Sequence, residues 1–349
     1  MLDFSLCSIK HLSVHQTGNK QNGEPLLLSK QSVALLDEDL EAHLLSYFLK
    51  PFQTQEYYHL SFSNDDHALN PVFNYAKDLF ERPDSFHIQS IHLAKHLYEI
   101  AIHPNILAGD FYVCSFDGMQ YQGNLVQAIG IFKAETKDHF LKVSRIGQDY
   151  DLAVESGIAI DKLDKGCLII NVEEEKGFRV CVTDKTNKSS EAAYWKDLYL
   201  KIKPCSDAYH LTQNFLHVTK DFLTKQVPKE FEVSRTDQID LLNRSVAFFK
   251  ENETFNEHLF TEQVFEGNEG LVTSFKDYKN SVQTEYEIEL KDGFDISEQA
   301  VKKQAKVFKS ILKLDKNFHI YIHGNKNMIE KGIESDGRKF YKIYYNEEH

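Results

Sequence analysis

The amino-acid sequence predicts an α+β protein with an N-terminal antiparallel meander sheet with helices, a central helical region and a small C-terminal α+β unit. Three observations carry this prediction. Helical spacing of apolar residues precedes a series of short β-rich runs, turn signals rather than long connections separate those runs, and helical patterns return after Pro204. Because the close spacing leaves no room for crossover helices, we expect neighbouring strands to pair antiparallel.

The length of 349 residues indicates two or three domains, at roughly 150 residues per domain. Changes in the pattern along the chain place the expected domains at residues 1–205 (α+β), 206–281 (a helical linker or domain) and 282–349 (an α+β unit with a lysine-rich helix). Hydrophobic residues make up 42% of the chain and aromatic residues 12%, which is enough for packed cores and is not a disordered composition.

The first third of the chain predicts one strand followed by helices. LCSIKHLSV, at 6–14, is typical of a strand. A helix around Leu40 to Phe48 follows from apolar residues at helical spacing, and Pro51 ends the pattern. A second amphipathic pattern, at 85–102, stops before Pro104, because a proline disfavours the helical conformation of the residue that precedes it.

The meander itself is predicted from six short β-rich runs. They lie at 110–118, 123–135, 139–146, 157–162, 166–175 and 178–184. Turn signals such as LDKG and EEKG separate the later runs.

Residues 206–262 read as helical, and two helix starts are predicted from their capping residues. Ser234 precedes Asp237 by three positions, and Thr254 precedes Glu257 by three, the second in the pattern of a capping box. Mixed structure is expected from about residue 282, with strands at 284–290, 317–325 and 339–347.

The charge distribution is strongly uneven. The whole chain carries a formal net charge of −13, yet residues 301–331 hold eight Lys and two acids, or 8 − 2 = +6. The remainder therefore sums to −13 − 6 = −19. An acidic protein of this kind is not coated with nucleic acid over its whole surface, but a local basic site is compatible with it.

Residues 295–316 predict a helix that displays its lysines on one stripe. Asp295 or Ser297 can cap its start, and the lysines from Lys302 to Lys316 recur at spacings of four and three. A row of like charges costs a helix roughly 0.2–0.5 kcal/mol per pair, and no acid is interleaved to offset it. Phosphates recur along nucleic-acid backbones, so the row matches a polyanion, and the absence of Arg within 301–331 indicates weak sequence specificity.

The candidate nucleic-acid-binding residues are Lys302, Lys303, Lys306, Lys309, Lys313, Lys316, Lys326 and Arg338. The competing interpretation is a solvated helix face in which Lys serves solubility.

Two other constellations bear on catalysis or metal binding. His92 and His96 stand at i,i+4, which is metal-ligand spacing on a helix, but Leu93 takes the place where a zinc protease has Glu. Asp117 followed by Glu135 and Lys137 loosely matches the arrangement of metal-dependent nucleases. Phosphate-binding glycine loops and a GxSxG nucleophile motif are absent from the sequence. We therefore expect no cofactor, no bound metal and no enzymatic activity.

The five cysteines are scattered and odd in number, with no CxxC pair, which favours reduced thiols in a cytoplasmic protein. The first ten residues lack the charged and apolar regions of a signal peptide, and no uncharged apolar run is long enough to cross a membrane.

Several segments, in order and over nearly the full length, resemble the bacterial nucleoid-associated protein family typified by NdpA, also called YejK. They are DFYVCSFDG…NLVQAIGIFKAE, GIAIDKLDKGCLIIN, AAYWKDLYLKIKP and the C-terminal LDKNFHIYIHGN…IEKG…RKFYKIYY. The resemblance implies association with the bacterial nucleoid, a cytoplasmic location and no established enzymatic activity, and it supplies no binding residues.

The leading hypothesis is a non-enzymatic nucleoid-associated protein whose lysine-rich helix binds the phosphates of double-stranded DNA without sequence specificity. Two alternatives stay open at this point. The chain is either a protein–protein interaction module that another protein recruits to the nucleoid, with a possible homo-oligomer or protein partner, or a metal-dependent nuclease.

Overall fold

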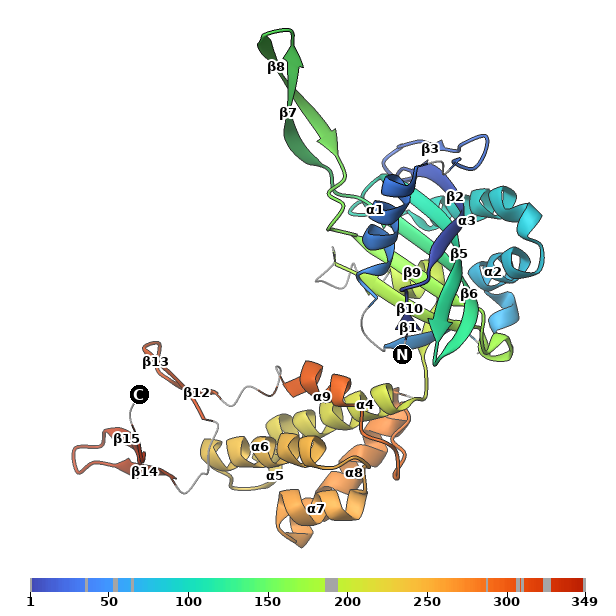
Figure 1. Ribbon diagram of the computed structural model, residues 1–349. Helices are drawn as coiled ribbons and strands as arrows, with labels where there is room; N and C mark the ends of the chain where they lie inside the picture. Colours follow the sequence, from blue (N-terminus) through green and yellow to red (C-terminus); the bar gives the residue numbers. More distant parts are fainter. Residues whose placement is uncertain are drawn as a thin grey trace. The chain divides into compact units, whose positions relative to one another are not determined.

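The computed structural model describes residues 2–34, 37–52, 56–63, 66–185, 194–286, 288–305, 308, 311–322 and 328–347. The chain forms two compact units, Met1–Cys205 (unit 1) and Ser206–His349 (unit 2). Both are drawn in Figure 1. The fold is α+β, with a large antiparallel sheet in unit 1, and with helices and two short strand pairs in unit 2.

Unit 1 is built on a nine-stranded sheet with the order β11-β4-β10-β9-β6-β5-β2-β3, and β1 pairs with β5. The strands are β1 (Leu2–Asp3), β2 (Ser8–Thr17), β3 (Leu26–Leu27), β4 (Tyr57–Leu60), β5 (Gly109–Tyr121), β6 (Asn124–Ala134), β9 (Lys165–Ile170), β10 (Arg179–Asp184) and β11 (Ile202–Pro204). Every neighbouring pair is antiparallel, and β5, β6, β9 and β10 follow one another as the predicted meander.

Helices cover both faces of this sheet (Figure 1). Helices α2 (Pro71–Glu81) and α3 (Phe86–Ile100), with a π-helical segment at Tyr194–Leu200, pack on one face. Helix α1 (Glu38–Leu49) packs on the other. Alternate residues of each central strand therefore enter different cores: in β6, Ile131 joins the α2–α3 side and Phe132 the α1 side.

Local sequence explains the helix starts of unit 1. The Asp37 carboxylate accepts the backbone N–H groups of Asp39 and Leu40 at the start of α1. At the start of α2, the side-chain oxygen of Asn70 accepts the backbone N–H groups of Val72 and Phe73. Pro71 occupies the first position of this helix, where no N–H donor is needed.

Between β6 and β9 the chain forms a separate two-stranded hairpin, β7 (Asp138–Ile146) and β8 (Asp149–Gly157). The sequence predicted the first strand, but the strand expected at 157–162 is wrong. Strand β8 ends at Gly157, and residues 158–164 form turns that lead into β9.

Unit 2 contains helices around a core rich in phenylalanine. They are α4 (Ala208–Asp221), α5 (Val227–Glu230), α6 (Arg235–Glu251), α7 (Glu257–Phe265), α8 (Glu269–Tyr286) and α9 (Glu298–Ala305), with a π-helical turn at Phe222–Gln226. Phe255 is completely buried, and its ring lies 4.3 Å from that of Phe215 and 5.0 Å from that of Phe294.

One of the two helix starts predicted from capping residues in this unit is confirmed. Ser234 and Asp237 cap each other's backbone at the start of α6. The box at Thr254 is wrong, because α7 starts later, with Asn256 as its cap. The strand expected at 284–290 is also wrong, since α8 continues to Tyr286.

Unit 2 ends in two hairpins, β12 (Ile311–Leu314) with β13 (Phe318–Tyr321), and β14 (Ile329–Ile333) with β15 (Lys339–Ile343). Leu312 and Ile322 form a small apolar cluster with Ile239 of α6, against which Ile329 and Tyr341 of the second hairpin also pack.

Candidate nucleic-acid interface

The continuous lysine-rich helix expected to reach Lys316 is wrong. Helix α9 ends at Ala305, and Ile311–Leu314 form strand β12 instead. The physical reason is the apolar alternation of Leu312, Leu314, Ile320 and Ile322, which a hairpin can place on one face against α6. The candidate cations therefore do not share one helical stripe.

The candidates are distributed over three kinds of structure. Lys302 and Lys303 lie on α9, Lys313 lies on β12 and Lys316 lies in the turn that follows β12. Arg338 lies in the turn between β14 and β15. Lys306, Lys309 and Lys326 lie outside the described residues.

On α9, the two described lysines have different environments. The Nζ atom of Lys302 lies 3.1 Å from a carboxylate oxygen of Glu298, and both side chains are highly exposed, at 77% and 85%. Exposed pairs of this kind are worth at most about 1 kcal/mol, so Lys302 is still available to a phosphate. Lys303 lies over the Tyr209 ring, with its Nζ atom 5.7 Å from the ring centroid. Ser297 caps the helix, as one of the two predicted alternatives, because its Oγ accepts the N–H of Ala300 at 3.4 Å.

The first hairpin combines basic and aromatic residues. Lys313 stands opposite His319 in the register, and Tyr321, two residues on, is 58% exposed. Asp315 has φ of 52°, which allows the tight turn that presents Lys316 to solvent.

The second hairpin adds cations that the candidate set did not include. Lys331 and Lys342 are exposed on β14 and β15, and a hydrogen bond to Tyr344 raises the pKa of Lys342. Arg338 is exposed and forms an ion pair of 2.6 Å with Asp336. The signal for these residues was the charge total: residues 301–343 hold eleven Lys and Arg and four acids, or 11 − 4 = +7.

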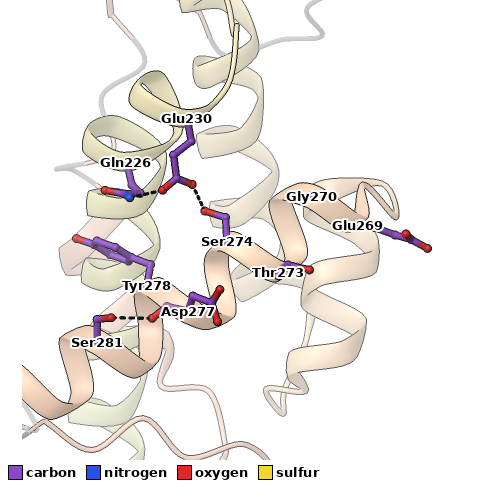
Figure 2. Close-up of a pocket in the computed structure, with 9 residues that line it drawn as sticks. All are labelled: Gln226, Glu230, Glu269, Gly270, Thr273, Ser274, Asp277, Tyr278 and Ser281. Carbon is purple, nitrogen blue, oxygen red and sulfur yellow. Dashed lines mark hydrogen bonds between the residues drawn. The ribbon is translucent and has the colours of Figure 1, made fainter.

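A groove on the helical part of unit 2 is lined by acidic rather than basic side chains (Figure 2). Its volume is about 740 Å³, and Glu230, Glu269 and Asp277 line it together with hydroxyl side chains. Hydrogen bonds from Ser274 and Gln226 lower the pKa of Glu230 and hold it as a carboxylate. Three carboxylates without a lining cation repel phosphate, so this groove is not part of a DNA surface.

The three residues of the nuclease hypothesis do not converge, and that hypothesis is wrong for them. Asp117 lies in β5 beyond Phe116, which pairs with Ala128, whereas Glu135 follows Ala134 at the other end of β6. Ala128 and Ala134 are six residues of strand apart, or about 20 Å, and Asp117 and Glu135 lie beyond these two ends. Lys137 forms an ion pair of 3.2 Å with Asp110 instead.

Glu135 belongs to a buried ionic cluster that sequence reasoning missed. Its carboxylate accepts hydrogen bonds from Lys133 at 3.0 Å and from the Tyr194 hydroxyl at 2.7 Å. It also lies 3.8 Å from Lys165, which pairs with Asp184 at 2.9 Å. Both lysine side chains are at most 1% exposed, and burial lowers the pKa of Lys133. Glu135 and Asp184 together balance the charges of the two buried lysines, so the Glu135 carboxylate takes part in structural ion pairs.

The two helix histidines form no metal site either. His92 Nδ1 lies 3.1 Å from Gln89 Oε1, and the His96 ring stacks on Tyr199. Across the described residues, no group of three His, Cys, Asp or Glu side chains is arranged to hold a metal ion. Among those same residues, no helix is long and apolar enough to span a membrane.

Comparison with known protein families gives a match over most of the chain. The model of a family described as nucleoid-associated protein YejK matches residues 13–338, which include most of the sheet of unit 1, the helices of unit 2, the hairpin of β12 and β13, and strand β14. No curated protein matches the chain.

Proposed function

Because the chain belongs to the YejK family of nucleoid-associated proteins, we propose that it binds double-stranded DNA directly, without sequence specificity and without catalysis. The proposed contact surface is the basic C-terminal segment, comprising α9 and the two hairpins, and it includes Lys302, Lys303, Lys306, Lys309, Lys313, Lys316, Lys326 and Arg338.

The observation that carries this proposal is the concentration of positive charge in one segment. Residues 301–343 sum to +7 in a chain of −13, so everything else sums to −13 − 7 = −20. A polyanion is repelled by most of this molecule and attracted by this part. Lysine is a point charge that pairs with phosphates but does not read base edges in a bidentate way, which accounts for the absence of sequence specificity.

The test is a titration of duplex DNA at several salt concentrations. Replacing Lys302, Lys303, Lys316 and Arg338 with Glu is expected to abolish binding at low salt. For the unaltered chain, the logarithm of the binding constant should fall against the logarithm of salt with a slope of about −0.9 per phosphate contacted.

A matched control separates local contact from total charge. Lys30, Lys95, Lys250 and Lys276 are exposed and lie outside the segment, so their replacement by Glu makes the same change in net charge. We expect this control to bind nearly as well as the unaltered chain. Equal loss in both variants, or unchanged binding in the first, would remove the segment from the proposal. If the unaltered chain binds no DNA at low salt, recruitment by another protein becomes the better account.

A further inference from the structure

The hairpin of β7 and β8 extends away from the body of unit 1 as a sheet of its own (Figure 1). Its strands pair without irregularity from Asp138 opposite Gly157 to Ile146 opposite Asp149, and Gly147, with φ of 65°, forms part of the connecting turn. A two-stranded hairpin without a covered face is marginally stable in water.

The base of this hairpin is firmly attached to the sheet. The Asp164 carboxylate accepts the backbone N–H groups of Glu135 and Thr136 at 2.7 and 2.8 Å, just before β7 begins. Lys162, five residues after the end of β8, forms an ion pair of 3.2 Å with Asp138 at the start of β7. The hairpin is thus anchored as a defined element.

One face of the hairpin is apolar and exposed. In the register, Leu141 lies opposite Val154 and Val143 lies opposite Leu152, so these four side chains share one face. Each is between 62% and 69% exposed, and Tyr150, opposite Arg145 on the same face, is 71% exposed. Contiguous apolar surface of this kind marks an interaction site.

We propose that this apolar face binds the same face of a second copy of the chain. The hairpin is a poor ligand for nucleic acid, because residues 138–157 hold two cations and four acids, or 2 − 4 = −2. Its opposite face already pairs Lys142 with Glu155 at 2.9 Å, so the charged side chains there are partly satisfied within the hairpin.

The apolar face is complementary to itself. A half-turn about an axis parallel to the strands places β7 of one copy over β8 of the other, which is the isologous geometry of a two-fold dimer. Leu141 then meets the partner's Val154, Val143 meets the partner's Leu152, and Arg145 lies over the partner's Tyr150, a favourable cation–π pair.

Arg145 favours this arrangement over the other two-fold packing. It is the charged side chain of the apolar face, because the register places Lys142, Asp149, Asp151 and Glu155 on the opposite face. An axis perpendicular to the strands would place β7 on β7 and β8 on β8 and so separate Arg145 from the partner's Tyr150, whereas the parallel axis brings these two side chains together.

The size of the face sets the strength of the association. The five side chains offer on the order of 500 Å² per copy, below the roughly 800 Å² per partner of a standard stable interface. The dimer therefore forms in a concentration-dependent equilibrium that sedimentation can follow.

The first test measures the mass of the full chain by sedimentation equilibrium over a series of concentrations. We expect a monomer–dimer equilibrium that Leu152→Glu with Val154→Glu shifts to monomer. The matched control, Ile146→Glu with Ala153→Glu, changes exposed positions of the opposite face and should leave the equilibrium in place. A chain that is monomeric throughout, or dimers that persist in the Leu152→Glu, Val154→Glu variant, would overturn the proposal.

The second test determines which two-fold axis relates the two copies, by disulfide formation between cysteine variants in a Cys7→Ser background. Mixing the single variants Leu141→Cys and Val154→Cys should give a cross-linked heterodimer, because the parallel axis brings these positions together. Cross-links that form instead between Leu141→Cys and Val143→Cys would reject the parallel axis. Neither test involves DNA, so the outcome is independent of the proposed function.

Discussion

His15 on β2 shows how a single buried ring makes the stability of unit 1 depend on pH. The side chain is buried, its Nε2 lies 2.9 Å from Ser90 Oγ, and its Nδ1 accepts the backbone N–H of Ser29 at 3.2 Å. Burial, with a smaller contribution from His87, lowers the pKa of His15 from 6.5 to about 4. The neutral ring is therefore the folded form.

The pH dependence follows from this difference in pKa. Between pH 6.5 and about 4 the unfolded chain binds a proton that the folded chain does not, so stability falls as pH falls. Lowering the pH from 7 to 5 should cost unit 1 about 2 kcal/mol through this group. Denaturant unfolding at both pH values measures it, and His15→Gln should remove this part of the pH slope. An unchanged slope in the variant would show that His15 does not cause it.

At the same scale, the buried ion pairs around Glu135 are a feature that the sequence does not predict. Lys133 lies in a predicted β-rich run and Lys165 in the LDKG turn signal, and local pattern would place both charged side chains in solvent, yet both are buried. Their partners, Asp184 and Tyr194, come from distant segments, so only the folded chain shows that the charges are compensated.

Among the elements, α6 is a helix whose start the sequence specifies locally. The Ser234 hydroxyl accepts the N–H of Asp237 at 3.1 Å, and the Asp237 carboxylate accepts the N–H of Ser234 at 3.1 Å. Ser234→Ala should lower the free energy of unfolding of unit 2 by about 1 kcal/mol, as measured by denaturant unfolding.

Ser281→Ala is the control for this prediction, because the Ser281 hydroxyl lies within α8 and donates to the carbonyl of Asp277, four residues earlier. Its effect should stay within about 0.5 kcal/mol. Comparable losses in both variants would argue against a specific role of the cap.

The segment from residue 298 to 322 is the element that local pattern misassigned. Its lysines recur at spacings of three and four, which predict a helix, whereas its apolar residues recur at spacings of two, which predict a strand. The segment is too short for either period to exclude the other. The packing of Leu312 and Ile322 on Ile239 favours a hairpin over a helix, and these contacts join residues that are 312 − 239 = 73 and 322 − 239 = 83 positions apart.

At the scale of the whole molecule, the two units have separate cores. Phe255 lies in the core of unit 2 and Phe111 in a core of unit 1, and both are completely buried. Phe255→Ala should cost unit 2 about 3–5 kcal/mol while leaving the exchange of unit 1 amides almost unchanged, and Phe111→Ala should do the reverse. Native-state hydrogen exchange measures both. If either substitution alone speeds the exchange of amides in both units equally, the two units unfold together and the prediction is wrong.

The sequence by itself determined the family likeness, the α+β class, most strands of the meander and the cap of α6, because period, turn residues and caps act over a few neighbouring positions. Only the tertiary structure decided which of the charged residues are buried in pairs, that the basic segment divides into a helix and two hairpins, and that one face of the β7–β8 hairpin is left without a core. These properties depend on contacts between residues far apart in the chain, for which a local pattern contains no information.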